Sequence, residues 1–164
     1  MRKENKFSTL QLTFMLLLRF AIGWHILYEG IAKLLDPSWS SVEFLNESQW
    51  VLSGFSQWII SDPNVLSVVD FMNTWGLIAI GLGLIFGLFS RLASIAGAFL
   101  LLIYYLNAPP LTGIEYTLPA GGNYIIVNET LIEVIALCVL ALFPTSHIFG
   151  LDAIFNRVYK KDRS

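Results

Sequence analysis

The sequence predicts an all-α integral membrane protein, a four-helix bundle with short interfacial helices in its first external loop. Three observations support this fold class. Apolar residues make up 55% of the 164 residues and charged residues only 13%, whereas roughly a quarter of the residues in soluble domains are charged. Four segments are apolar enough and long enough to cross a bilayer. Lysines and arginines outside these segments all fall on one side of them.

The four predicted spans cover approximately residues 10–35, 66–89, 91–107 and 124–143, within a single transmembrane domain of residues 1–164. The first span follows a basic stretch, as a signal peptide would, but it contains Arg19 and ends without a small-residue cleavage site. We therefore expect it to be retained. The second and third spans meet at Ser90-Arg91 with no loop between them, which predicts a tight antiparallel hairpin.

The positions of the basic residues predict the orientation of the spans. The loops at 36–65 and 107–123 contain no lysine or arginine. By the positive-inside rule, both termini then face the cytoplasm and these two loops face outward. The basic residues on the cytoplasmic side are Arg2, Lys3, Lys6, Arg91, Arg157, Lys160, Lys161 and Arg163.

The first external loop has the composition of a segment that lies in the lipid headgroup region. Ser40 followed by Glu43 matches a capping box for a short helix, and Asp62-Pro63 matches the start of the helix that leads into the second span. Aromatic residues of the kind that anchor at the membrane interface recur along the loop: Trp39, Phe44, Trp50, Phe55 and Trp58.

Small residues predict where the second and third spans pack closely. Gly83 and Gly87 are four residues apart in the second span, and Ala93 and Gly97 have the same spacing in the third. In lipid this spacing lets helix backbones approach one another. We assign these residues to packing and to no chemistry.

The first and fourth spans carry an unusual set of ionisable residues. Arg19 and Glu133 each lie nine residues from the expected start of their span, which places both about 14 Å deep. The sequence therefore predicts an Arg19–Glu133 ion pair near the middle of the membrane. Above it we expect a cluster on the external side: His25, Glu29, Lys33, Asn128 and Glu129.

These groups have a functional and a structural interpretation. Ionisable residues inside a membrane are costly and commonly mark functional sites, so Arg19, Glu29 and Glu133 are candidate catalytic residues. The same charges can also pair only to fix the order of the helices, and Lys33 can extend to the interface. The candidate ligand-binding residues are His25, Lys33, Tyr104, Asn107, Asn128 and Glu129.

The sequence gives little reason to expect a tightly bound cofactor. It has no cluster of cysteines and histidines with metal-ligand spacing, and we expect no metal site. His147 lies beyond the cytoplasmic end of the fourth span, too far from His25 to share a haem, and Cys138 is expected to be a small packing residue. Nucleic acid is not an expected partner, because no basic stripe is present. Any redox role would use a diffusible carrier such as a quinone.

Short motifs spread along the chain resemble one family of membrane proteins. In chain order they are Arg19-x3-Gly23, Gly30-x2-Lys33, a glycine-rich second span leading into Phe89-Ser90-Arg91-Leu92, the acidic Glu133, and Phe149-Gly150-Leu151-Asp152-Ala153. Over nearly its whole length the chain resembles the DoxX family, and in particular the DoxD-type small subunit of thiosulfate:quinone oxidoreductase.

The resemblance implies a multi-pass subunit of the bacterial cytoplasmic (inner) membrane, associated with a quinone-linked oxidoreductase and offering a polar pocket on the external side. A diffusible quinone is then the expected ligand, and a protein partner or a second copy is expected beside the lipid bilayer. The alternative is a non-catalytic anchor or assembly partner of a redox or envelope protein complex. A transporter is disfavoured because no inverted repeat is visible.

Overall fold

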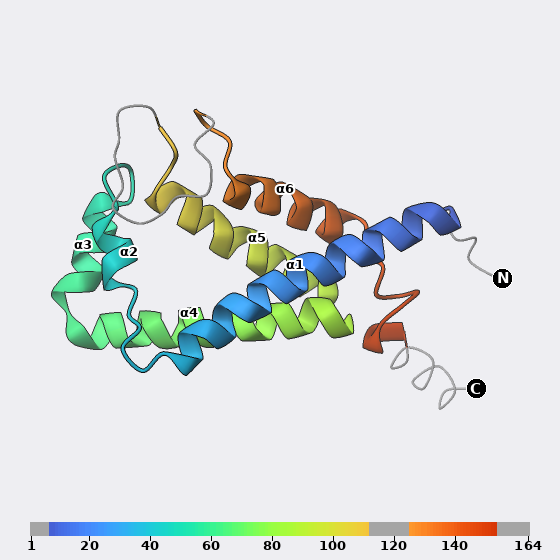
Figure 1. Ribbon diagram of the computed structural model, residues 1–164, viewed down its shortest axis with the longest axis horizontal. Coiled ribbons are helices and arrows are strands. Elements are labelled where there is room, and N and C mark those ends of the chain that lie inside the picture. The colour runs from blue at the N-terminus through green and yellow to red at the C-terminus, as the bar shows by residue number, and fades with distance from the viewer. Residues whose placement is uncertain (1–6, 112–124, 154–164) are drawn as a thin grey trace.

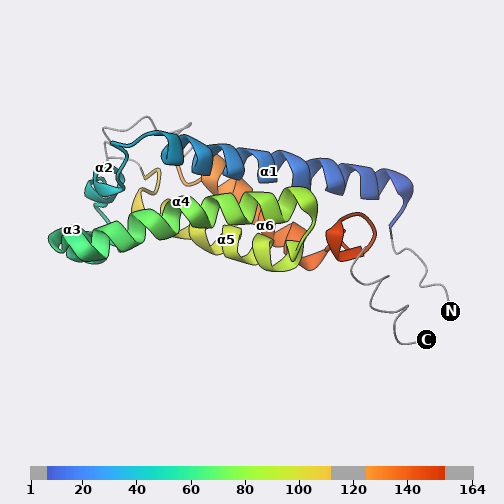
Figure 2. The ribbon, with the colours of Figure 1, turned by 90° about the horizontal axis from the view of Figure 1, so that it is seen from below.

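The computed structural model describes residues 7–111 and 125–153, and all regular elements in these ranges are helices. In chain order they are α1 (Thr9–Leu35), α2 (Val42–Asn46), α3 (Ser53–Ser61), α4 (Pro63–Phe86), α5 (Ser90–Asn107) and α6 (Glu129–Leu142). The molecule is elongated, and its four longer helices run side by side with α2 and α3 gathered at one end (Figures 1 and 2). We call that end the loop end, and the opposite end, where α4 turns into α5, the turn end.

Among the described residues, three helices are long and apolar enough to cross a membrane: α1, α4 and α5. The fourth predicted span is represented by α6, which has 14 residues and therefore a length of only about 21 Å. That is less than the roughly 30 Å of hydrocarbon in a bilayer. The helix begins at Glu129 because the side chain of Asn128 accepts a hydrogen bond from the backbone of Leu131 and caps it. The predicted start at residue 124 lies outside the described residues.

The predicted orientation rests largely on residues outside the described part of the chain. Of the eight basic residues that define it, Arg91 is the one described, and it lies in the first turn of α5 at the turn end. Large apolar side chains are exposed on every long helix, as expected of a surface that faces lipid. They include Phe14, Trp24, Phe71, Phe99 and Ile135.

Side-chain caps that the local sequence supplies account for three of the six described helix starts, those of α1, α4 and α6. At α1, Ser8 and Gln11 form a reciprocal capping box. At α4, Asp62 accepts a hydrogen bond from the backbone of Asn64, and Pro63 occupies the first turn. The capping box expected at Ser40 is not formed, because α2 begins one residue later and the Ser40 hydroxyl donates to a carboxylate on α4.

Close backbone contact holds α1 against α4. A Cβ atom added at Gly81 would lie 2.7 Å from the backbone nitrogen of Leu27 and 2.8 Å from the carbonyl oxygen of Gly23. A Cβ at Gly30 would lie 2.9 Å from the backbone nitrogen of Ile78. Such contacts take the place of hydrophobic burial as the packing force between helices in lipid.

The small residues that the sequence marked have two different roles. Gly83 packs against Ala93, as expected for the hairpin, with 3.0 Å from its would-be Cβ to the Ala93 side chain. Gly87 instead ends α4 in a left-handed conformation, with φ of 65°, which is where glycine is favoured. Helix α4 therefore stops at Phe86, three residues before the predicted limit, and the tight turn into α5 follows.

Candidate functional site

Arg19 lies at the turn end and binds the segment that follows α6. One guanidinium nitrogen donates to the Thr145 hydroxyl at 3.0 Å, and another donates to the Phe149 carbonyl oxygen at 3.0 Å. The side chain is buried, with 7% of the residue exposed. The predicted Arg19–Glu133 ion pair is therefore wrong.

The error came from the assumed depth of both residues. Helix α6 begins at Glu129 rather than at residue 124, which moves Glu133 about 7 Å towards the loop end. Arg19 in turn packs against Gly87 at the turn end, 3.2 Å from the position of a Cβ there. Helix α1 extends beyond this point by ten residues, so counting from its start placed Arg19 too deep in the membrane.

The turn end forms a clamp, which we define as Arg19, Gly87, Thr145, Phe149 and Asp152. Asp152 links the clamp to the turn between α4 and α5 through two hydrogen bonds. Its carboxylate accepts from the backbone nitrogen of Phe89 at 3.0 Å, and its own backbone nitrogen donates to the Gly87 carbonyl oxygen at 3.2 Å. The motifs Arg19-x3-Gly23, Phe89-Ser90-Arg91 and Phe149–Ala153 thus meet at one place and hold the segment after α6 in position.

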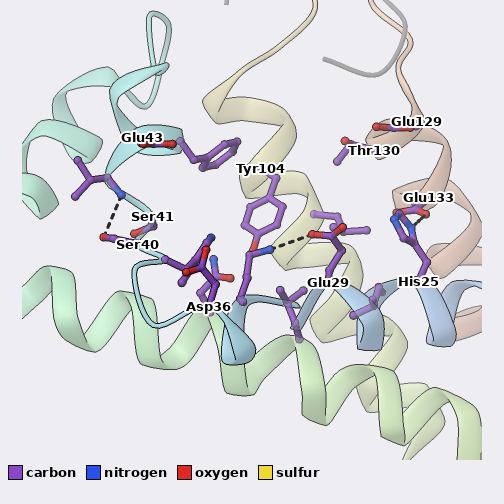
Figure 3. Close-up of a pocket in the computed structure, with 18 of the residues that line it drawn as sticks. His25, Glu29, Asp36, Ser40, Ser41, Glu43, Tyr104, Glu129, Thr130 and Glu133 are labelled. Carbon is purple, nitrogen blue, oxygen red and sulfur yellow. Dashed lines mark hydrogen bonds and ion pairs between the residues drawn. The ribbon is translucent and has the colours of Figure 1, made fainter. Parts of the chain in front are cut away.

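A pocket of about 740 Å³ opens at the loop end, between the α2 segment and the ends of α1, α4, α5 and α6. Figure 3 shows residues of α1 and α6 on one side, residues of the α2 segment on the other, and Tyr104 of α5 projecting between them. Its polar and charged lining residues are His25, Glu29, Lys33, Asp36, Ser38, Ser40, Ser41, Glu43, Asn73, Tyr104, Glu129, Thr130 and Glu133.

Two charge contacts shape the wall of the pocket (Figure 3). His25 Nδ1 lies 2.5 Å from a carboxylate oxygen of Glu133, which joins α1 to α6. The Lys33 ammonium donates to Glu29 one helical turn away at 3.2 Å and lies 5.4 Å from the centre of the Trp39 ring. Lys33 is therefore held in the wall, with 15% of its side chain exposed, and does not extend freely to the interface.

The roof of the pocket is the segment from Trp39 to Phe44, and two buried or half-buried side chains attach it to the long helices. Asp70 of α4 accepts hydrogen bonds from both the Ser40 and the Ser41 hydroxyl and from the Ser41 backbone. Asn107, at the end of α5, donates to the Phe44 carbonyl oxygen at 2.7 Å and accepts from Ser56 of α3 at 2.8 Å.

The structure thus divides the predicted site residues into two groups. The pocket brings together His25, Glu29, Lys33, Tyr104, Glu129 and Glu133. Three others lie outside its lining: Arg19 belongs to the clamp, Asn107 holds the roof, and Asn128 caps α6. Sequence reasoning missed Asp70, which is a single acidic residue in an apolar helix and could have been singled out on that ground.

Carboxylates dominate the electrostatics of the pocket. Its described lining has five of them, Glu29, Asp36, Glu43, Glu129 and Glu133, against one lysine and one histidine. At the open edge, the Ser38 hydroxyl and backbone N–H both donate to Asp36 and lower the pKa of its carboxyl group. Hydrogen bonds to the ionised form have this effect, so Asp36 stays negatively charged. The pocket therefore disfavours anions and suits a neutral or cationic ligand.

Comparison with known families supplies the classification. A family model described as DoxX matches residues 14–108, which is more than half of the chain. The chain belongs to the DoxX family. Comparisons with curated proteins and with solved structures gave no significant match. The DoxX match spans most of α1 and all of α2 to α5, so it includes the α1 wall, the roof and Tyr104, while Glu129 and Glu133 lie beyond it.

Proposed function

We propose that this DoxX-family protein is a quinone-binding subunit of a quinone-linked oxidoreductase in the bacterial cytoplasmic membrane. The observation that carries the proposal is the His25–Glu133 pair in the wall of a 740 Å³ pocket. Small-molecule sites typically occupy about 300–1,000 Å³, so the pocket is large enough for a quinone ring and the first part of its tail. The exposed apolar side chains of the long helices suit a protein that meets its carrier in the lipid phase.

The chemistry of the pair fits quinone reduction. Reduction of a quinone to a quinol takes up two electrons and two protons. In this proposal the associated oxidoreductase delivers the electrons and the pocket delivers the protons. The carboxylate of Glu133 binds His25 Nδ1 and orients the ring, so that Nε2 is the nitrogen left to face a quinone oxygen and donates to it when the ring carries a second proton. Glu29 and Glu129, which line the same pocket, then return protons to His25.

The charge of the pocket makes it a poor binding site for thiosulfate as the electron donor. A thiosulfate dianion would meet five carboxylates and a single lysine that is already bound to Glu29. Like charges that share one pocket repel each other strongly where bulk water does not screen them. If the protein serves a thiosulfate:quinone oxidoreductase of the DoxD type, the thiosulfate is oxidised on the partner and the quinone is bound here.

Binding by the purified protein tests the proposal. The protein in lipid nanodiscs is titrated with decylubiquinone and with menadione, while the melting temperature and any co-purified quinone are measured. We expect stabilisation by at least one quinone and weaker binding by Glu133→Gln. Asp62→Asn is the matched control, because it removes a carboxylate at the same end but outside the pocket, and asparagine caps a helix as well as aspartate does.

The outcomes separate the two functional interpretations. If the wild-type protein neither contains quinone nor responds to it, the proposal fails. If Glu133→Gln lowers stability but leaves quinone binding, and the partner's activity per assembled complex, unchanged, then the His25–Glu133 contact only holds α1 to α6. That result would favour the non-catalytic anchor.

A further inference from the structure

Two buried polar atoms in the pocket lack partners. Within the described residues, three buried side-chain oxygens make no hydrogen bond: Ser48 Oγ, Asn73 Oδ1 and Tyr104 Oη. Two of these three, on Asn73 and Tyr104, belong to residues that line the pocket. Buried polar groups without partners are rare in folded proteins. Their concentration in one cavity indicates that something absent from the isolated chain completes them.

The two atoms come from different helices and form one subsite. Asn73 is on α4 and Tyr104 on α5. The Asn73 amide lies beside the Tyr104 hydroxyl, but neither Asn73 Oδ1 nor Tyr104 Oη makes a hydrogen bond of acceptable geometry. The Tyr104 ring is held by an edge contact with Phe44 of the roof, with 5.3 Å between ring centres. It points from α5 into the pocket (Figure 3). The ring contact therefore holds the hydroxyl oxygen at a buried position in the pocket.

We infer that Tyr104 and Asn73 bind one oxygen of the quinone head group, and this inference rests on the proposed function. A quinone carbonyl oxygen is an acceptor, which the Tyr104 hydroxyl can satisfy as a donor. A quinol hydroxyl is also a donor, which the Asn73 amide oxygen can accept. The pair therefore matches a ligand oxygen in either redox state. His25, which lines the same pocket, is left to serve the other oxygen of the ring.

A purely structural role for the two side chains predicts different behaviour. Removing a hydroxyl that makes a hydrogen bond lowers stability, whereas removing one that is buried and unpartnered does not. The neighbouring residue provides the comparison. The Tyr105 hydroxyl donates to the Ile126 carbonyl oxygen at 2.7 Å, so Tyr105→Phe removes a bond that already exists in the ligand-free protein.

The test measures ligand-free stability and quinone affinity for the same set of variants. Wild type, Tyr104→Phe, Asn73→Leu and Tyr105→Phe are prepared in nanodiscs, and the melting temperature and the dissociation constant for decylubiquinone and its quinol are determined. We expect Tyr104→Phe to melt at or above the wild-type temperature and to bind quinone about 3- to 10-fold more weakly, the range for one neutral hydrogen bond. Asn73→Leu should weaken quinol binding more than quinone binding. Tyr105→Phe should lower the melting temperature and leave affinity unchanged.

Each contrary outcome has a distinct meaning. If wild type binds quinone and Tyr104→Phe binds it equally well, water fills the subsite, and this inference falls while the proposed function stands. If Tyr104→Phe melts lower by as much as Tyr105→Phe does, the hydroxyl already has a partner in the ligand-free protein and the inference is wrong. If wild type binds no quinone, the proposed function and the inference fail together.

Discussion

Replacing Arg19 with methionine should destabilise the protein without removing ligand binding. Methionine keeps much of the volume of the side chain but loses the two hydrogen bonds to Thr145 and Phe149. Bonds from a charged donor contribute about 1.5–3 kcal/mol each, so the pair contributes at most about 3–6 kcal/mol. Removing the buried charge recovers part of the desolvation cost, and we expect a net loss of about 2–3 kcal/mol. For a chain of this size that corresponds to a fall of about 5–10 °C in melting temperature.

The assay combines thermal unfolding in nanodiscs with limited proteolysis of the segment after α6. In Arg19→Met that segment, residues 144–153, should be cut faster, while the affinity for quinone changes by less than about threefold, because Arg19 does not line the pocket. Arg91→Met is the control. Arg91 is an exposed arginine at the same end, and its removal from the first turn of α5 should be neutral. If Arg19→Met kept its stability but lost quinone binding, the assignment of Arg19 to the clamp would be refuted, and Arg19 would again be a candidate catalytic residue.

Three further predictions concern packing, the roof and the open edge of the pocket. Gly81→Ala should lower the free energy of unfolding by about 1–3 kcal/mol, because its Cβ meets the α1 backbone. Gly76 has open space around it, so Gly76→Ala should be neutral or stabilising. Unfolding measurements on both variants test this difference. Asp70→Ala removes the acceptor of three hydrogen bonds and should therefore raise the rate of amide hydrogen exchange across residues 41–46. Unchanged exchange rates there would show that the roof does not depend on Asp70. The pKa of Asp36 is lowered in the folded protein, so its stabilising contribution is present above its unfolded pKa and is lost as pH falls through the folded value. An NMR titration should place that pKa below the usual value of about 3.9, and Ser38→Ala should raise it.

Features encoded locally in the sequence were predicted well. The α4–α5 hairpin follows from two adjacent apolar runs separated by Ser90 and Arg91. Of the cluster expected on the external side, His25, Glu29 and Lys33 follow one another at four-residue spacing on α1, which places them near one face of the helix, and they line one cavity. The helix start at Asp62-Pro63 follows from capping chemistry that acts over a few residues. Hydropathy and short-range hydrogen bonding are sufficient for this level of structure.

Features that depend on contacts between distant parts of the chain were not predictable in the same way. The pairing of Arg19 was misjudged because hydropathy alone placed the start of α6 five residues too early, and because nothing local indicates that residues 145–149 return to α1. The cap at Asn128 was visible in the sequence as an asparagine followed by an acidic first turn. Using that signal would have moved Glu133 away from Arg19 and towards His25.

The positions of these contacts explain how a short helix places Glu133 accurately. Two side chains of α1 hold α6 and its extension, His25 at Glu133 and Arg19 at Thr145. On α1 these two residues are six positions apart, about 9 Å, while the stretch of α6 from Glu133 to Leu142 alone spans about 14 Å. The long, forked arginine side chain bridges the difference at the turn end and reaches two acceptors from two separate nitrogens, whereas a lysine side chain has a single nitrogen. With α5 packed along its length, α6 keeps the register that brings Glu133 to His25, while the Arg19 contacts fix the segment that follows α6.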